Sequence, residues 1–109
     1  MNLKWALLYN SSLLIEKRED VDIENFLDEE PDDSNPAVTA LWWETKGDWD
    51  KAHKMVQDGN QDNNWVHAHL HQAERDLSNA AYWYDRAEKP VCEIDIKEEW
   101  IMILSALST

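Results

Sequence analysis

The stretch WVHAHLHQAERD, residues 65–76, places three histidines at alternate positions beside several carboxylates. His67 and His71 are four residues apart, so a helix would carry both imidazoles on one face, a spacing that metal-binding helices use. Zinc requires three or four donors. The carboxylates that could supply a third donor are Glu44, Glu74 and Asp85. Nothing in the linear order selects among these carboxylates. As an alternative interpretation, one candidate cofactor is Zn²⁺ held by His67 and His71 with one of them, named here as Glu74.

A second set of residues has the chemistry of a ligand-binding groove. Its members are Trp42, Trp65, His69 and Tyr82. Aromatic faces together with nearby carboxylates suit a ligand that carries cationic groups. The alternative for the tryptophans is packing in a core, where each ring buries a large apolar area.

The sequence shows no complete catalytic set. Cys92 has no identifiable base, and Ser105 and Ser108 have no triad partners in view. The two glycines, Gly47 and Gly59, are too few for a glycine-rich phosphate loop. We therefore predict no catalytic residues and, apart from the zinc alternative, no cofactor.

From Pro36 onward the spacing of apolar residues predicts five helices. Their ranges are 36–46, 49–58, 63–75, 77–88 and 96–107. The aspartates at the predicted N-cap positions are Asp48, Asp62, Asp76 and Asp95. The last range carries a single apolar stripe, which must cover another part of the protein. The members of this stripe are Ile96, Trp100, Ile103, Leu104 and Leu107.

The chain contains an internal repeat of a helix, a tight turn and a second helix. When the sequence is aligned with a shifted copy of itself, residues of the same kind pair. The pairs are Ala40 with Ala68, Trp42 with Leu70, Asp48 with Asp76, Trp49 with Leu77, Ala52 with Ala80 and Val56 with Tyr84. Each pair keeps its size class or its capping role, and the small alanines let helices approach closely. The repeat predicts two short helical hairpins, with the last helix as their cap.

Two segments of the repeat resemble a known type of helical hairpin. The runs GDWDKAHKMVQ and RDLSNAAYWYDRA look like the turn and second helix of tetratricopeptide-type repeats. The resemblance covers about residues 37–88. It implies hairpins that stack on one another and bind a partner through a groove.

A longer run, to about residue 107, is similar to a family of small uncharacterised microbial proteins. Their motif is W-V-H-A-Y-L-H-R followed by G-D-x-x-N-A-x-Y-W-Y. The matching residues of this chain are Trp65, Val66, His67, Ala68, Leu70, His71, Asp76, Asn79, Ala80, Tyr82, Trp83 and Tyr84. The chain departs at His69, Gln72 and Arg75, where Tyr, Arg and Gly are usual. This resemblance implies no activity.

The repeat also bears on the role of the histidines. A helical wheel leaves His67 and His71 opposite the apolar face, whereas the repeat pairs them with Thr39 and Trp43, at positions that pack between the helices of a hairpin. We favour the pairing, because a helix inside a stack is covered on more than one side. His67 and His71 are then expected to be buried packing residues, and His69 to face the groove.

The chain before Pro36 divides into two parts. Residues 1–18 are predicted to form an N-terminal helix, with a hairpin turn as the alternative. Residues 19–35 are acidic and typical of a linker, within which residues 21–29 could form a short docking helix. The helical-hairpin domain then occupies residues 36–109.

Charge and composition restrict the partners of this 109-residue chain. Its 10 Lys and Arg against 23 Asp and Glu give a net charge of −13, which would repel nucleic acid. The single cysteine fits a reducing compartment, and no apolar stretch approaches membrane-spanning length. We therefore expect a cytoplasmic protein that binds neither nucleic acid nor a membrane.

Together these patterns predict an all-α protein or peptide interaction module without catalytic activity. Its partner would carry cationic groups, and assembly into a homo-oligomer is left open. The alternative is a small metal-binding or metal-dependent hydrolytic protein that uses His67 and His71.

Overall fold

A computed structural model describes residues 23–32 and 34–108 of the chain. The predicted N-terminal helix at residues 1–18 lies outside the described residues. The described part is all-α, as predicted, and it contains no strand. Its helices are α3 (Ile23–Asp28), α4 (Pro36–Thr45), α5 (Trp49–Met55), α6 (Gln61–Ala73), α7 (Leu77–Ala87) and α8 (Ile96–Leu107).

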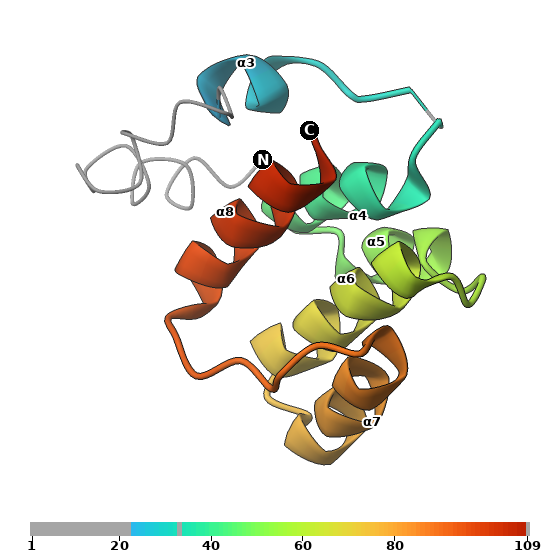
Figure 1. Ribbon diagram of the computed structural model, residues 1–109. Coiled ribbons are helices and arrows are strands. Elements are labelled where there is room, and N and C mark those ends of the chain that lie inside the picture. Colours follow the sequence, from blue (N-terminus) through green and yellow to red (C-terminus); the bar gives the residue numbers. More distant parts are fainter. Residues whose placement is uncertain (1–22, 33, 109) are drawn as a thin grey trace.

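The helices form two hairpins and a covering helix. α4 pairs with α5 and α6 pairs with α7, while α8 packs on both α4 and α6 (Figure 1). α6 therefore contacts α4, α5, α7 and α8, which makes it the central element of the fold. None of the described helices is long and apolar enough to cross a membrane.

Side-chain caps begin two of the helices where the sequence predicts them. The carboxylate of Asp48 accepts a hydrogen bond from the amide of Lys51 at 3.0 Å. Asp95 does the same for the amide of Lys97 at 2.8 Å. Asp76 occupies the N-cap position of α7, although its side chain makes no capping hydrogen bond.

The predicted cap of α6 is wrong. Asn60, and not Asp62, caps this helix, and its side-chain oxygen accepts from the amide of Asn63 at 2.8 Å. The helix begins two residues earlier than predicted, at Gln61, because Asn60 provides an equally good cap. Asp62 then lies in the first turn, where its negative charge interacts favourably with the helix dipole.

The turns of the two hairpins have the same backbone conformation. Gly47 has a φ of 82°, and Arg75, which occupies the same place in the repeat, has a φ of 69°. The Gly47 amide donates to the Glu44 carbonyl at 3.1 Å, and the Arg75 amide donates to the Gln72 carbonyl at 3.0 Å. Left-handed backbone favours glycine. The second turn is therefore strained where the first is not.

The repeat correctly predicts most of the residues that share the core. The paired residues that are fully buried are Ala40, Ala52, Val56, Ala68, Leu70, Ala80 and Tyr84. Trp49 and Leu77 differ, because Trp49 donates its indole N–H to the Leu70 carbonyl of α6, whereas Leu77 is 54% exposed. In the described part of the chain no third hairpin follows to cover Leu77.

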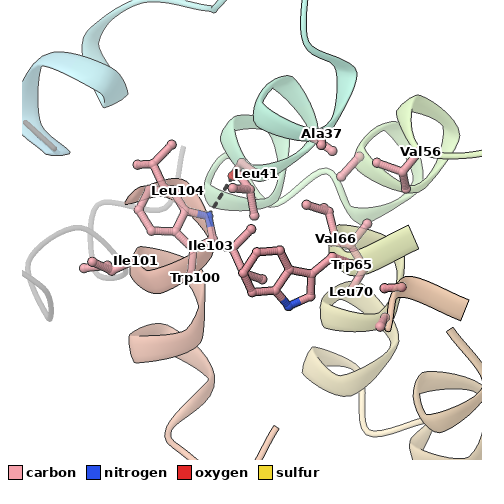
Figure 2. Close-up of a cluster of buried hydrophobic side chains, with 14 of the residues drawn as sticks. Ala37, Leu41, Val56, Trp65, Val66, Leu70, Trp100, Ile101, Ile103 and Leu104 are labelled. Carbon is pink, nitrogen blue, oxygen red and sulfur yellow. Dashed lines mark hydrogen bonds between the residues drawn. The ribbon is translucent and has the colours of Figure 1, made fainter. Parts of the chain in front are cut away.

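The apolar stripe of α8 closes the core. Trp100, Ile103 and Leu104 of this stripe are fully buried, and Ile96 and Leu107 are partly buried. The indole N–H of Trp100 donates to the Leu41 carbonyl at 3.0 Å, so this large ring is buried with its polar atom paired. Figure 2 shows Trp100, Ile103 and Leu104 of α8 on the side of the helix that faces α4 and α6.

The acidic segment contains the short docking helix that the sequence allows. Ile23 and Leu27 of α3 enter the core, and the ring of Phe26 packs edge-on against Trp100 with 5.7 Å between centroids. The ammonium group of Lys46 donates to the Leu27 carbonyl at 3.2 Å. Part of the predicted linker therefore belongs to the folded domain.

Candidate metal centre

Three imidazoles from two neighbouring helices meet in one place. His53 lies on α5, and His67 and His71 lie on α6. One ring nitrogen from each lies within 4.8 Å of the others. The closest pair is Nε2 of His53 and Nε2 of His67, which are 2.9 Å apart. We call these three residues the imidazole cluster.

Tryptophans hold the imidazole cluster in place. Trp49 stacks on His53 with 4.6 Å between ring centroids and 16° between ring planes. Trp83 of α7 stacks on His67 at 3.9 Å and 14°. His67 and His71 are themselves stacked at 5.0 Å and 27°, as expected for rings one helical turn apart. These contacts fix the ring planes and leave few rotamers.

Burial lowers the pKa of two of the imidazoles, those of His53 and His67. The pKa of His67 is lowered to about 4, first by burial and then by the charges that His53 and His71 would carry. The pKa of His53 is also lowered, by burial and by His71, against the opposing effect of nearby carboxylates. Neutral imidazole is the form that binds metal ions. At neutral pH His53 and His67 are therefore in the form that binds metal ions.

The distance between the ring nitrogens of His53 and His67 is close to that between two ligand nitrogens of a zinc site. Zn–N distances of about 2.0–2.1 Å in a tetrahedral site place two ligand nitrogens about 3.3 Å apart. The separation of 2.9 Å between His53 and His67 needs to grow by only a few tenths of an ångström. The buried Nδ1 atoms of His67 and His71 have no hydrogen-bond partner among the described residues.

The carboxylates considered from the sequence lie in different places. Glu74 lies beside the cluster, with Oε1 3.6 Å from Nδ1 of His71, and it forms a second close group with His71 and Asp76. Glu44 instead contacts His69. Asp85 is exposed on α7.

His53 is the member of the imidazole cluster that the sequence patterns did not predict. It lies in the preceding hairpin, fourteen positions before His67, and no local spacing connects the two. The available signal was elimination, because the chain has only 4 histidines and His53 is the one outside residues 65–76.

A second polar group is buried on another side of α6. Nδ1 of His69 lies 2.7 Å from Oε1 of Glu99, and Nε2 lies 2.9 and 3.0 Å from the two oxygens of Glu44. The Tyr84 hydroxyl donates to both oxygens of Glu99, at 2.9 and 2.7 Å. We call these four residues the buried bridge.

The buried bridge carries charge. Burial alone would lower the pKa of His69, but the carboxylates of Glu44 and Glu99 outweigh it and raise that pKa to about 10. His69 is therefore a cation that donates both N–H groups. Burial and the charge of Glu99 raise the pKa of Tyr84, so its hydroxyl stays protonated and donates to the carboxylate.

The prediction that His69 faces a groove is wrong. Its side chain is 0% exposed, because α4 and α8 each bring a carboxylate over it. Trp42 and Trp65 are also buried, and of the four predicted groove residues only Tyr82, at 51%, is well exposed. These residues therefore do not share an open surface.

The prediction that His67 and His71 are buried is confirmed. Their exposed fractions are 3% and 6%. The repeat gave the better indication, since the helical wheel placed both residues on the side away from the core. Burial does not remove their ligand chemistry, because His53 is partly exposed and connects the cluster to the surface.

Comparison with known proteins adds no assignment. No protein-family model, no curated protein and no solved structure matches this chain.

Proposed function

We propose that this protein binds a transition-metal ion, with Zn²⁺ as the first candidate, through His53, His67 and His71. One observation carries the proposal, the meeting of three imidazole nitrogens within 4.8 Å of one another. These are three of the 4 histidines in the chain. Three nitrogen donors from the protein are a common basis for a zinc site.

The donor set favours one class of metal. Imidazole nitrogen suits zinc, copper, nickel and iron, whereas Mg²⁺ and Ca²⁺ take oxygen ligands. The exposed carboxylates of this acidic chain attract any cation weakly, so selectivity for imidazole-preferring metals distinguishes the cluster from the surface.

The site would connect the two hairpins. His53 belongs to the first hairpin, through α5, and His67 and His71 belong to the second, through α6. α5 is a short helix whose one fully buried residue is Ala52. An ion held by all three imidazoles would therefore attach α5 to α6 more firmly, and metal binding would stabilise the folded state.

Isothermal titration of the metal-free protein with ZnCl₂ tests the proposal. Excess Mg²⁺ in the buffer occupies the exposed carboxylates. We expect one zinc per chain. In His53→Ala the affinity should fall by more than the roughly 10–100-fold that is lost when a hydrogen-bond partner of a metal ligand is removed. His53 is the variant of choice because it is partly exposed, so its loss disturbs the core least.

The double variant Asp85→Asn, Glu88→Gln is the matched control, since it removes exposed charge from α7 without touching the cluster. Zinc binding that is absent from the wild type, or equal in wild type and His53→Ala, would exclude this function.

A second proposal is the interaction module predicted from the sequence. It is supported by a surface hollow of about 370 Å³ whose lining includes Leu77 and Ile94, and both of these side chains are about half exposed. Given the net charge of −13, the proposed occupant is a peptide with an apolar residue and cationic groups. Selection from a random peptide library should enrich such sequences on the wild type and not on Leu77→Asp. Equal enrichment on both would reject the hollow as the binding surface.

A further inference from the structure

Nδ1 of His71 lies beside the carboxylate of Glu74. The inference drawn from this contact rests on the proposed metal binding. We infer that Glu74 is a positioning residue, which accepts a hydrogen bond from Nδ1–H of His71 and so leaves Nε2 of His71 to bind the metal. The starting observation is the distance of 3.6 Å between Nδ1 of His71 and Oε1 of Glu74.

The position of Nδ1 of His71 beside Glu74 points to Nε2 as the ligand atom of this residue. His67 presents Nε2 to Nε2 of His53 at 2.9 Å, while its Nδ1 is buried without a partner. The ring of His71 is stacked on that of His67 with only 27° between their planes, and its Nδ1 is likewise buried and unpartnered among the described residues. Nδ1 of His71 lies beside Oε1 of Glu74, and the two nitrogens of an imidazole point in different directions, so Nε2 is the nitrogen of His71 that remains to bind an ion.

A buried N–H without an acceptor is unfavourable, and His71 has an acceptor within reach. The separation of 3.6 Å is too long for a hydrogen bond, and a charge-assisted bond to a carboxylate is about 2.7–2.9 Å long. Closing the gap needs a movement of less than an ångström. For His67 no carboxylate lies at a comparable distance among its described contacts.

Glu74 is able to make this movement. Its backbone is fixed, because its amide donates to the Leu70 carbonyl at 3.2 Å at the end of α6. Its side chain is 36% exposed, and no hydrogen bond of the described residues holds the carboxylate elsewhere. The carboxylate therefore starts from a fixed point beside His71 and turns freely toward it.

The expected effect follows from how carboxylates act on metal-bound histidine. An acceptor on the distal nitrogen fixes the tautomer and the ring orientation, and it makes the ligating nitrogen more basic. Losing such a partner typically weakens metal binding by about 10–100-fold. Glu74 would thus act on affinity through His71, without contacting the ion.

Charge alone is the main competing explanation, and the chain offers a control for it. Asp50 on α5 and Glu74 both act on the charge of His53, and both favour its protonated form. Asp50 is exposed, and among the described residues it forms no hydrogen bond or ion pair with a ring nitrogen of the cluster. Asp50→Asn therefore removes the same unit of charge without removing a hydrogen-bond acceptor from His71.

The test compares zinc dissociation constants, measured by competition with a chromogenic chelator, in the wild type, Glu74→Gln, Glu74→Asp, Asp50→Asn and Asp76→Asn. We expect about 10–100-fold weaker binding in Glu74→Gln, partial recovery in Glu74→Asp, and changes below about threefold in Asp50→Asn and Asp76→Asn. An equal loss of zinc affinity in Glu74→Gln and Asp50→Asn would show that Glu74 acts only through its charge, and it would overturn the inference. An equal loss in Asp76→Asn would also overturn it, because Glu74 and Asp76 would then hold the ion directly with His71.

A second measurement separates positioning from general stability. In the zinc-loaded wild type, long-range ¹H–¹⁵N NMR correlations should show a proton on Nδ1 of His71 and the metal on Nε2. Coordination through Nδ1 would overturn the inference while leaving the proposed zinc binding intact. The melting temperature of metal-free Glu74→Gln should match the wild type, since a negative charge at a helix C-terminus is not stabilising. A wild type that binds no zinc would overturn the function and this inference together.

Discussion

The buried bridge and the imidazole cluster place histidines of one helix in opposite charge states. His69 is enclosed by the carboxylates of Glu44 and Glu99, and its pKa is raised to about 10. His67, two residues earlier on α6, is surrounded by other rings, and its pKa is lowered to about 4. Both residues are buried. The neighbours therefore decide the charge, and burial alone does not.

One helix, α6, therefore contributes to two kinds of buried polar site. A buried charge needs partners at hydrogen-bond distance, and every nitrogen and carboxylate of the bridge has them. In the imidazole cluster His53 and His67 stay neutral, and the buried Nδ1 atoms of His67 and His71 have no hydrogen-bond partner among the described residues. The bridge is thus a satisfied structural element, while the cluster retains the capacity to bind an ion.

Leucine in place of His69 should destabilise the protein far more than leucine in place of His67. His69→Leu leaves Glu44 and Glu99 buried without their cation, and removing one partner of a buried ion pair costs about 3–5 kcal/mol of the free energy of unfolding. Leucine fits the site, since the repeat places Leu41 at this position in the first hairpin. His67→Leu removes a neutral ring and should cost only about 1 kcal/mol. Urea unfolding of the metal-free variants measures both values.

Equal losses in the two variants would show that the bridge is no more important than the cluster. The exposed neighbour of Glu99 gives a further check, because Glu98→Ala should change the free energy of unfolding by less than about 0.5 kcal/mol.

Zinc should stabilise the protein through the imidazole cluster and not through the buried bridge. Zinc at a free concentration of 100 times its dissociation constant should raise the free energy of unfolding by about 2.7 kcal/mol, because the ion binds the folded state. Chelation should reverse the gain, and His53→Ala should abolish it. Differential scanning fluorimetry with and without zinc measures the shift. A gain of the same size in His53→Ala would locate the ion elsewhere.

The charge states themselves predict opposite responses to pH. Folded His69 keeps its proton up to about pH 10, whereas unfolded histidine releases it near pH 6.5, so the stability from the bridge is full below pH 6.5. That stability is lost as the pH rises toward 10, by up to about 1.4 kcal/mol per pH unit. Folded His67 takes up a proton only near pH 4, so its contribution to stability falls as the pH drops from about 6.5 toward 4.

Titration of the imidazole C–H resonances by NMR measures these charge states residue by residue in metal-free protein. One resonance should move near pH 10 and another near pH 4, and the signal lost in His69→Leu should be the one that titrates high. Resonances that all titrate near pH 6.5 would contradict the difference between the two sites.

Local patterns predicted the fold because local interactions build it. The spacing of Trp100, Ile103 and Leu104 fixes the buried face of α8, and Asp48 and Asp95 fix helix starts by capping amides within three residues. Equivalent alanines marked where the helices of each hairpin approach closely. These signals lie within a few residues of one another and can be read from the chain.

The partners of the histidines could not be predicted, because they come from distant helices. Glu44 and Glu99 lie 25 and 30 residues from His69 in sequence, and no periodicity connects them. His53 meets His67 only because α5 packs against α6. A helical wheel assumes one buried face, whereas α6 is covered by four helices, so the wheel placed His67 and His71 away from the core although both are buried. The repeat pairing corrected these two residues, but it did not reveal the carboxylates that cover His69.

The turn that ends α6 lies next to the cluster and away from the bridge. A substitution there should change the free energy of unfolding only slightly. Arg75→Gly should raise the free energy of unfolding by up to about 1 kcal/mol, because glycine adopts a φ of 69° without the strain of a side chain. Gly47→Ala is the matched reverse change in the first hairpin. It should lower the free energy of unfolding by about 1 kcal/mol through backbone strain alone, since an added Cβ there meets no atom within 4 Å. Urea unfolding of both variants checks the signs, and the high titration of His69 should persist in each. A loss of stability in Arg75→Gly would mean that the arginine side chain, and not the turn, supports the end of α6.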